Sequence, residues 1–364
     1  MDYGPFFQCF YHKACADGIT AASVMHRDVK SSSSIHEARF TPIGHSKPYI
    51  VSKFVCKVGK KIPTWTKRYW AAFVDYTPPF SVVRDLASVV LIQGISPEKL
   101  IILDHHQEIP EDQIKRYELD SGWMDVKIIV NQEMSGASLA WRYIPSILHG
   151  GEERDHEDPS TPPLVRYVED RDLWRFRYGD LSRIIWYGIS YEIKLAKGKP
   201  NIESWSWSID NVTRYLITGT PIYDAFITKT VKANNTSLWS IFDKRLFKLV
   251  DYEDEIRVLL IKNERSGDPF IDPGILSSVS LIDEVCSMFL DLSPEDKEKI
   301  GRYSVVAMSN NKRKVSFRSR NGDALKIATR FGGSGHRNAE GCTNTTYYDM
   351  IKESKECREI FNEQ

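Results

Sequence analysis

The stretch Leu100-Ile101-Ile102-Leu103-Asp104-His105-His106 places four aliphatic residues directly before an acid and two imidazoles. A short apolar run of this kind, bounded by turn signals, predicts a buried strand. In an open α/β sheet, ligands bind in the crevice at the carboxyl ends of the strands. The stretch therefore predicts that Asp104, His105 and His106 lie where such a fold places its binding site.

Three further apolar segments also run into an acid or a histidine. They are Phe6–His12, Ala71–Asp75 and Leu164–Asp170. Taken singly, each end residue has an ordinary structural interpretation, as a packed histidine, a turn acid or a member of a surface ion-pair network. Their recurrence at the ends of apolar segments favours a shared edge of one sheet.

The rest of the first half alternates strand and helix patterns. Strands are predicted over 6–11, 69–75, 100–103 and 126–130, and helices after Gly18, over 81–87 and after the N-cap candidate Ser135. Residues 41–70 are interpreted as a long loop with a short edge strand near 49–55, and 149–163 as a surface loop. Strands that alternate with helices predict an α/β fold with a doubly wound, mostly parallel sheet.

The second half predicts a smaller α/β domain joined by a helical linker. Residues 177–250 have helical periodicity, 256–262, 303–308 and 314–318 have strand patterns, and 279–290, 324–331 and the last twenty residues have helix patterns. We therefore predict a metal-binding domain over 1–190, a linker over 191–250 and a substrate-binding domain over 251–364.

Composition limits the classes of function. The 364 residues carry 49 basic and 49 acidic side chains, which argues against a dedicated binder of long duplex DNA. The six cysteines form no CxxC pair and no secreted framework, and neither a signal peptide nor a long apolar run is present, so we expect an intracellular, cytoplasmic protein that does not span a membrane.

Acids and imidazoles gathered at one sheet edge indicate a metal site. The set comprises His12, Asp17, Asp75, Asp104, His105, His106 and Asp170. Carboxylates buried together repel one another unless cations are present. A mixture of carboxylate and imidazole ligands suits manganese, with iron, cobalt or zinc as competitors and magnesium less favoured. Two such ions can activate water and stabilise a phosphoryl transfer, and Asp75 is the natural candidate to bridge them.

A glycine-rich segment forms the second candidate site. Gly332, Gly333 and Gly335 would allow backbone amides to approach a phosphate, and His336 adds a donor. Basic residues upstream, including Arg318 and Arg320, would form a cationic patch beside it. The alternative is a flexible loop beside a solvated basic hairpin.

The motifs resemble those of the DHH phosphoesterase family, in the branch with the DHH-associated C-terminal domain, which includes RecJ-like nucleases, oligoribonucleases and cyclic-dinucleotide phosphodiesterases. Asp104-His105-His106 matches the motif that names the family, and His12 with Asp17-Gly18, Phe73–Asp75 and Tyr167–Asp170 resemble its other metal motifs. The segment 332–341 resembles its Gly-Gly-Gly-His box.

The resemblance implies roles for individual residues. His12 would bind one manganese ion, Asp17, His105 and Asp170 the other, and Asp75 both. His106 and His336 would contact the substrate phosphate, helped by Gly333, Gly335, Arg318 and Arg320, while Asp104 would support the histidine pair. Cys15 replaces an acid of the usual first motif, and because a buried thiol is ordinarily neutral, it is a weaker ligand candidate. Ser334 interrupts the glycine run.

These observations predict a manganese-dependent phosphodiesterase that hydrolyses short single-stranded oligonucleotides or small linear or cyclic nucleotides. Trp174, Phe176 and Phe331 are candidates for base stacking, with core packing as the alternative. Two other hypotheses stay open: a phosphomonoesterase or polyphosphate hydrolase on the same fold, and a nucleotide-binding protein whose metal site has degenerated at Cys15. The sequence leaves the oligomeric state open.

Overall fold

The computed structural model divides the chain into two compact units, Met1–Ile217 and Thr218–Gln364, which are described separately. The structure describes residues 4–44, 48–63, 65–106, 109–197, 200–227, 247–252, 256–262, 286–287, 289–291, 294, 302–310, 314–336, 339–343, 345 and 347–359.

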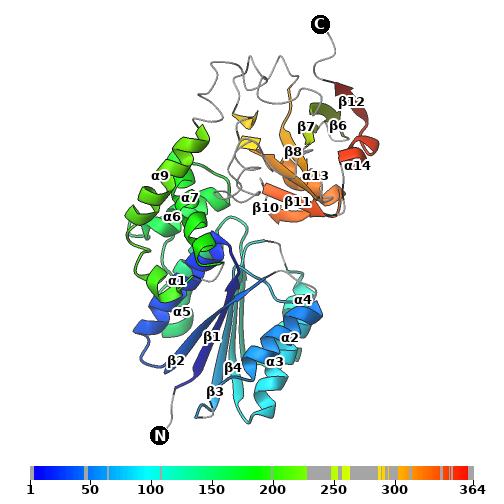
Figure 1. Ribbon diagram of the computed structural model, residues 1–364. Helices are drawn as coiled ribbons and strands as arrows, with labels where there is room; N and C mark the ends of the chain where they lie inside the picture. The colour runs from blue at the N-terminus through cyan, green and yellow to red at the C-terminus, as the bar shows by residue number, and fades with distance from the viewer. Residues whose placement is uncertain are drawn as a thin grey trace. The chain divides into compact units, whose positions relative to one another are not determined.

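Unit 1 is built on a five-stranded sheet with the order β2-β1-β3-β4-β5, and all neighbouring strands are parallel. Helices α1 and α5 cover one face, and α2, α3 and α4 cover the other (Figure 1). The predicted α/β class with a doubly wound parallel sheet is therefore confirmed. The strands are β1 (Phe6–His12), β2 (Glu37–Ile43), β3 (Arg68–Val74), β4 (Ser96–Asp104) and β5 (Asp125–Val130), and the helices are α1 (Ala16–Ser31), α2 (Pro48–Gly59), α3 (Phe80–Ile92), α4 (Glu111–Asp120) and α5 (Gly136–His149).

Strand side chains alternate between two hydrophobic cores, as the period of two requires. On β4, for example, Leu100 and Ile102 join the core under α2 and α3, whereas Ile101 and Leu103 join the core under α1 and α5. Because both faces are covered, the central strands are continuously apolar, and this is why their ends could be predicted from the sequence.

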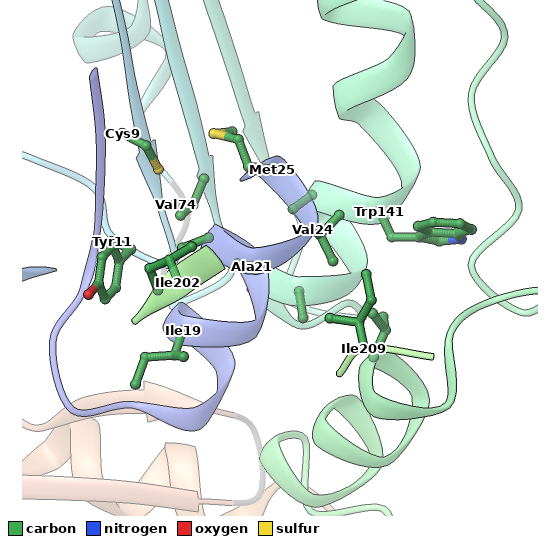
Figure 2. Packing of buried hydrophobic residues seen from close by; sticks show 14 of the residues in the cluster. Cys9, Tyr11, Ile19, Ala21, Val24, Met25, Val74, Trp141, Ile202 and Ile209 are labelled. Carbon is green, nitrogen blue, oxygen red and sulfur yellow. The ribbon is translucent and has the colours of Figure 1, made fainter. Parts of the chain in front are cut away.

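The helices after α5 pack on the same core as α1. They are α6 (Pro163–Asp172), α7 (Asp180–Leu195), α8 (Ile202–Ser206) and α9 (Thr213–Ile227). Figure 2 shows Ile202 and Ile209 among the side chains that pack around Ile19, Ala21 and Val24 of α1. The first part of the segment predicted as a linker, as far as Ile217, therefore belongs to unit 1.

Three predictions of secondary structure in unit 1 are wrong. The region 49–55 is part of helix α2 instead of an edge strand, and 41–43, predicted to begin a loop, are the last residues of strand β2. Residues 164–170 lie in helix α6, although their apolar run was grouped with the strand ends. A short apolar run does not distinguish a strand from a buried helix, and in each case the packing decides.

Unit 2 contains a seven-stranded mixed sheet with the order β10-β11-β9-β8-β7-β6-β12, in which only the pair β7–β8 is parallel among the described strands. Helix α13 packs against it through Ala324, Ile327 and Ala328. The predicted strands near 256–262, 303–308 and 314–318 and the helix near 324–331 are present. The elements are β6 (Phe247–Asp251), β7 (Arg257–Lys262), β8 (Val305–Asn310), β9 (Lys314–Ser319), α13 (Asp323–Arg330), β10 (Ser334–His336), β11 (Ala339–Thr343), α14 (Tyr347–Lys352) and β12 (Glu356–Glu359).

The last twenty residues hold a short helix followed by strand β12, where a terminal helix was predicted. Most of the helix predicted over 279–290 lies outside the described residues. Within the described ranges, no helix has the length and apolarity that crossing a bilayer demands.

Candidate metal centre

Asp75 follows β3, where the strand order reverses between β1 and β3, which is the position where doubly wound sheets bind ligands. Its amide donates to the Leu103 carbonyl at 2.9 Å, and its φ of 55° is left-handed, a conformation in which Asp is enriched over most residues. The buried carboxylate divides its oxygens between two sets of groups. Oδ2 lies 3.3 Å from His12 Nδ1, and Oδ1 lies 3.0 Å from His105 Nε2.

Asp17 occupies the first turn of α1 and is fixed by a second helix. The amides of Gly136 and Ala137, the first two residues of α5, donate to its carboxylate at 2.6 and 2.8 Å. Helix N-termini favour negative charge, so these amides suit a carboxylate at the buried position of Asp17. Its Oδ2 lies 3.3 Å from His105 Nε2. Helix α5 begins after Ser135, whose side chain caps it as predicted.

Two glycines allow this close approach. A Cβ atom on Gly18 would lie 2.7 Å from the His12 carbonyl oxygen and 3.0 Å from Asp75 Oδ2. A Cβ atom on Gly136 would lie 2.8 Å from the Cβ of Asp75 and 2.9 Å from Asp17 Oδ2. Glycine at position 18 therefore leaves room for the His12 carbonyl and the Asp75 carboxylate.

Asp104 organises the turn after β4. Its Oδ1 accepts hydrogen bonds from the amide of His105 at 2.8 Å and from Nδ1 of His106 at 2.7 Å. Its Oδ2 accepts the hydroxyl hydrogen of Thr77 at 2.6 Å. Asp104 therefore orients His106, whose ring is about one quarter exposed and is the more accessible of the two histidines.

Asp170, the acid predicted as a ligand, is in none of the three groups of close metal-ligand atoms found among the described residues. Its carboxylate accepts hydrogen bonds from the amides of Arg177 and Tyr178 and from the hydroxyl of Ser182, which fold the loop after α6. Asp172 lies near the cluster instead, with Oδ2 3.6 Å from His105 Nε2. Because the segment is helical, residues two apart point about 200° away from each other, so only one of these two acids can face the sheet edge.

Helical periodicity is the signal that would have selected Asp172. Residues 165, 168 and 172 share one helix face, and Val165 and Val168 are buried in the core. Thr77 and the amides of Gly136 and Ala137 were also missed, since their positions depend on the packing of distant segments.

The charged groups of the centre shift one another's pKa values. Burial raises the pKa of the Asp172 carboxyl to about 7, and the charges of Asp17 and Asp75 act in the same direction. Burial lowers the pKa of His105, but its hydrogen bonds to Asp17 and Asp75 outweigh this effect and hold the pKa well above its ordinary value. Burial also lowers the pKa of His106, but the hydrogen bond to Asp104 and the charge of Asp75 outweigh this effect and raise the pKa to about 9.

Asp75 shows the opposite shift. Burial would raise its pKa, yet the hydrogen bonds from His105 and His12 and the charge of His106 hold the pKa well below its ordinary range. The centre is therefore a set of anionic oxygens balanced by protons on imidazoles, an environment in which divalent cations can replace those protons.

The donors are close enough to bind cations. Three groups each have ligand atoms within 4.8 Å of one another: Asp75, Asp104, His105 and His106; His12, Cys15 and Asp75; and Asp17, His105 and Asp172. Asp75 and His105 each belong to two groups, so neighbouring ions would share ligands. Burial raises the pKa of Cys15 well above its usual value, and the negative charges of Asp75 and Asp172 add to this effect. The raised pKa favours a neutral thiol in the metal-free protein.

Unit 2 gives the glycine-rich segment a clear structural function. The Gly332 amide donates to the Thr329 carbonyl and the Gly333 amide to the Ala328 carbonyl, and Gly332 has a φ of 67°, which together form a Schellman cap at the end of α13. The amide of Gly333 is therefore engaged within the chain. Strand β10 pairs Gly335 with Glu340 and His336 with Ala339.

The two predicted substrate-binding arginines also have partners. Arg318 is nearly buried and donates to the Phe317 carbonyl, and Arg320 pairs with Asp291. Among the proposed stacking residues, Trp174 is buried beside Phe176, and Phe331 packs between Tyr252 and Phe317.

Comparison with known proteins gives distant relatives. No family model matches the sequence. A curated relative, the uncharacterized protein R106 of Acanthamoeba polyphaga mimivirus, is 21% identical over 339 residues, which are 91% of this chain and 66% of that protein. The chain thus spans slightly less than two thirds of the length of this relative.

Among solved structures, an exopolyphosphatase-related protein from Bacteroides fragilis is 11% identical, with a TM-score of 0.42 over 96% of this chain and 90% of its own. RecJ in complex with Mn²⁺ from Thermus thermophilus is 12% identical, with a TM-score of 0.40 over 93% of this chain and 49% of its own.

Proposed function

We propose that the protein is a metal-dependent phosphoesterase that hydrolyses phosphodiester bonds in short single-stranded oligonucleotides or small linear or cyclic nucleotides. The observation that carries this proposal is the divided carboxylate of Asp75. Because one oxygen faces His12 and the other faces His105, this side chain is placed to bridge two cations. The motif resemblance to DHH phosphoesterases supports the same class of reaction.

The donor sets assign the ligands. His12 and Asp75, with Cys15 nearby, would hold one ion, and Asp17, His105, Asp75 and Asp172 the other. The mixture of oxygen and imidazole donors favours manganese over magnesium. When bound, a pair of divalent ions lowers the pKa of water and offsets negative charge on the phosphoryl group.

The chain's own residues would position the substrate. Asp104 fixes the ring of His106 through Nδ1, and the partial exposure of this ring suits a hydrogen bond to a phosphate oxygen. By resemblance, Gly335 and His336 of unit 2 would contact the same phosphate. The engaged amide of Gly333 makes this residue a weaker candidate.

A substrate without a base is the second candidate. The burial of Trp174 and the core packing of Phe331 remove two of the three aromatic side chains proposed for stacking. Phosphomonoesters and polyphosphate, which need no base-stacking residue, are therefore the second candidate substrates.

The test is a substrate panel with Mn²⁺ that includes dinucleotides, longer oligonucleotides, cyclic dinucleotides, adenosine bisphosphate and polyphosphate, with products resolved by chromatography. We expect phosphodiester hydrolysis that Asp75→Asn abolishes, because Asn tolerates the left-handed backbone but removes the bridging charge. Arg84→Gln, on the exposed surface of α3, is the matched control. Turnover of polyphosphate alone would favour the second candidate, and unchanged hydrolysis by the Asp75 variant would refute the proposal.

A further inference from the structure

A cavity of about 290 Å³ lies within unit 1, and its lining includes none of the ligands assigned to the two ions in the proposed function. Residues of α5, of the loop 150–162, of α6 and of the loop 173–179 contribute to its lining. Its volume is close to the lower limit of small-molecule pockets. The polar and basic residues of the lining are Ser138, His156, Arg166, Arg175, Arg177 and Tyr178.

The acids that line the cavity are already engaged. Asp170 accepts three hydrogen bonds from the loop 173–179 and Ser182, and Glu169 accepts the amide hydrogen of Ser135 and pairs with Arg175 at 3.0 Å. Glu157 faces Arg177 at 3.5 Å, but both side chains are more than 60% exposed, so water screens that pair. The negative charge of the lining is therefore largely used within the protein.

Arg166 is the basic residue of the lining that has no such partner. Its guanidinium makes no hydrogen bond or ion pair with any residue that the structure describes, and its Nε is buried. Nδ1 of His156 makes no hydrogen bond within the described part of the chain, but it lies 3.9 Å from Oδ1 of Asp155. The positive charge of Arg166 is therefore not offset by any side chain that the structure describes, and an anion in the cavity would supply the missing partner.

We propose that this cavity is a binding site for a compact phosphate-bearing anion, with Arg166 as its principal cation. Guanidinium groups bind phosphate through paired, charge-assisted hydrogen bonds. The basic side chains come from three segments, the loop 150–162, α6 and the loop 173–179, and donors from several directions suit a tetrahedral oxyanion better than a planar carboxylate.

The site is connected to the metal centre through two elements. Ser138 is on the first turn of α5, whose amides hold Asp17, and Asp170 folds the loop that directly follows Asp172. The phosphate group can come from two sources: a second phosphate of the substrate, or a free anion that affects turnover. Binding itself does not depend on the proposed hydrolysis.

The first measurement is calorimetric titration of inorganic phosphate into the metal-free full-length protein carrying Asp75→Asn, so that the metal centre contributes little. Adding Arg166→Gln should weaken phosphate binding about tenfold or more, the loss typical of a charged hydrogen bond. Arg177→Gln replaces a mostly exposed side chain and should leave the fold intact, and it should weaken phosphate binding by a smaller factor. Arg84→Gln should leave phosphate binding unchanged. Equal affinity for phosphate in all four proteins, or no binding in any, would overturn the proposal.

The second measurement separates the two sources in the otherwise unaltered chain with Mn²⁺. If the site holds a substrate phosphate, Arg166→Gln raises KM for oligonucleotides with a terminal phosphate and leaves KM unchanged for oligonucleotides without one. If the site holds a free anion, added inorganic phosphate changes the turnover of the unaltered protein and not that of the variant. Because the titration needs no turnover, a failed hydrolysis assay and a failed anion site give different results.

Discussion

Asp170 and Asp172 are both acids of helix α6, yet their surroundings give them different roles. Asp170 is surrounded by hydrogen-bond donors of the protein, whereas Asp172 lies beside His105 and other carboxylates. A carboxylate surrounded by donors stabilises the fold, and one placed among like charges gains from a cation.

Replacing each acid by its amide should separate these roles. Asp172→Asn should weaken Mn²⁺ binding by about 100-fold, since even indirect partners of a metal ligand contribute 10–100-fold. Asp170→Asn should lower the free energy of unfolding by about 2–3 kcal/mol, because it removes charge from hydrogen bonds at a buried site. Calorimetric titration and thermal unfolding measure the two effects, and the reverse pattern would restore Asp170 as the ligand.

The raised pKa of Asp172, about 7, predicts a pH dependence in the metal-free protein. Between the ordinary value near 3.8 and about 7, the unfolded chain loses this proton while the folded chain keeps it. The folded state then binds more protons, so the free energy of unfolding falls as the pH rises through this range. Asp172→Asn removes this contribution, so its stability relative to the unaltered protein should increase from pH 4 to 7 and level off above. A constant difference in denaturant titrations would contradict this assignment.

The candidate residues were predictable to the extent that they follow central strands. His12, Asp75 and Asp104-His105-His106 come at the ends of β1, β3 and β4, whose unbroken apolar runs reveal them. Asp172 could not be predicted in this way. Selecting it requires recognising that the segment is a helix, and its apolar run is too short to distinguish a helix from a strand.

At the scale of elements, the N-terminus of α5 positions the centre. Two of its amides hold Asp17, and Gly136 leaves room for Asp75. Contacts of this kind join residues more than a hundred positions apart, which is why the sequence predicted a helix after Ser135 but not its function. The α2 region was mispredicted for a related reason, since its β-branched residues favour a strand until packing selects the helix.

Gly136→Ala should therefore damage the metal centre directly. The added methyl group would lie under 3 Å from Asp75 and from Asp17, so these side chains must move. We expect Mn²⁺ affinity to fall by about tenfold or more, as measured by calorimetric titration. Gly44→Ala is the control, because a methyl group there meets nothing within 4 Å. Equal affinity in the two variants would show that the N-terminus of α5 does not position the ligands.

At the scale of the whole molecule, all proposed metal ligands belong to unit 1, whereas the glycine-histidine segment belongs to unit 2. Unit 1 has two hydrophobic cores of its own. A fragment of residues 1–227, which ends with α9, should therefore fold and bind Mn²⁺ with affinity within about threefold of the intact chain.

The same fragment should hydrolyse phosphodiesters much more slowly, because it lacks Gly335 and His336, the residues of unit 2 that we propose to contact the substrate. Circular dichroism, calorimetric titration and the substrate panel, each run beside the intact protein, check these expectations. Full turnover by the fragment would show that unit 2 is dispensable, and a folded fragment without metal affinity would contradict the assigned ligands.

The most direct test of a shared pair of cations is a calorimetric titration of Mn²⁺ into the intact protein, His12→Ala and Asp75→Asn. We expect two ions per chain in the intact protein, weaker binding of one ion in the His12 variant, and weaker binding of both ions in the Asp75 variant. If the Asp75 variant binds either ion with the affinity of the intact protein, Asp75 does not bridge the pair.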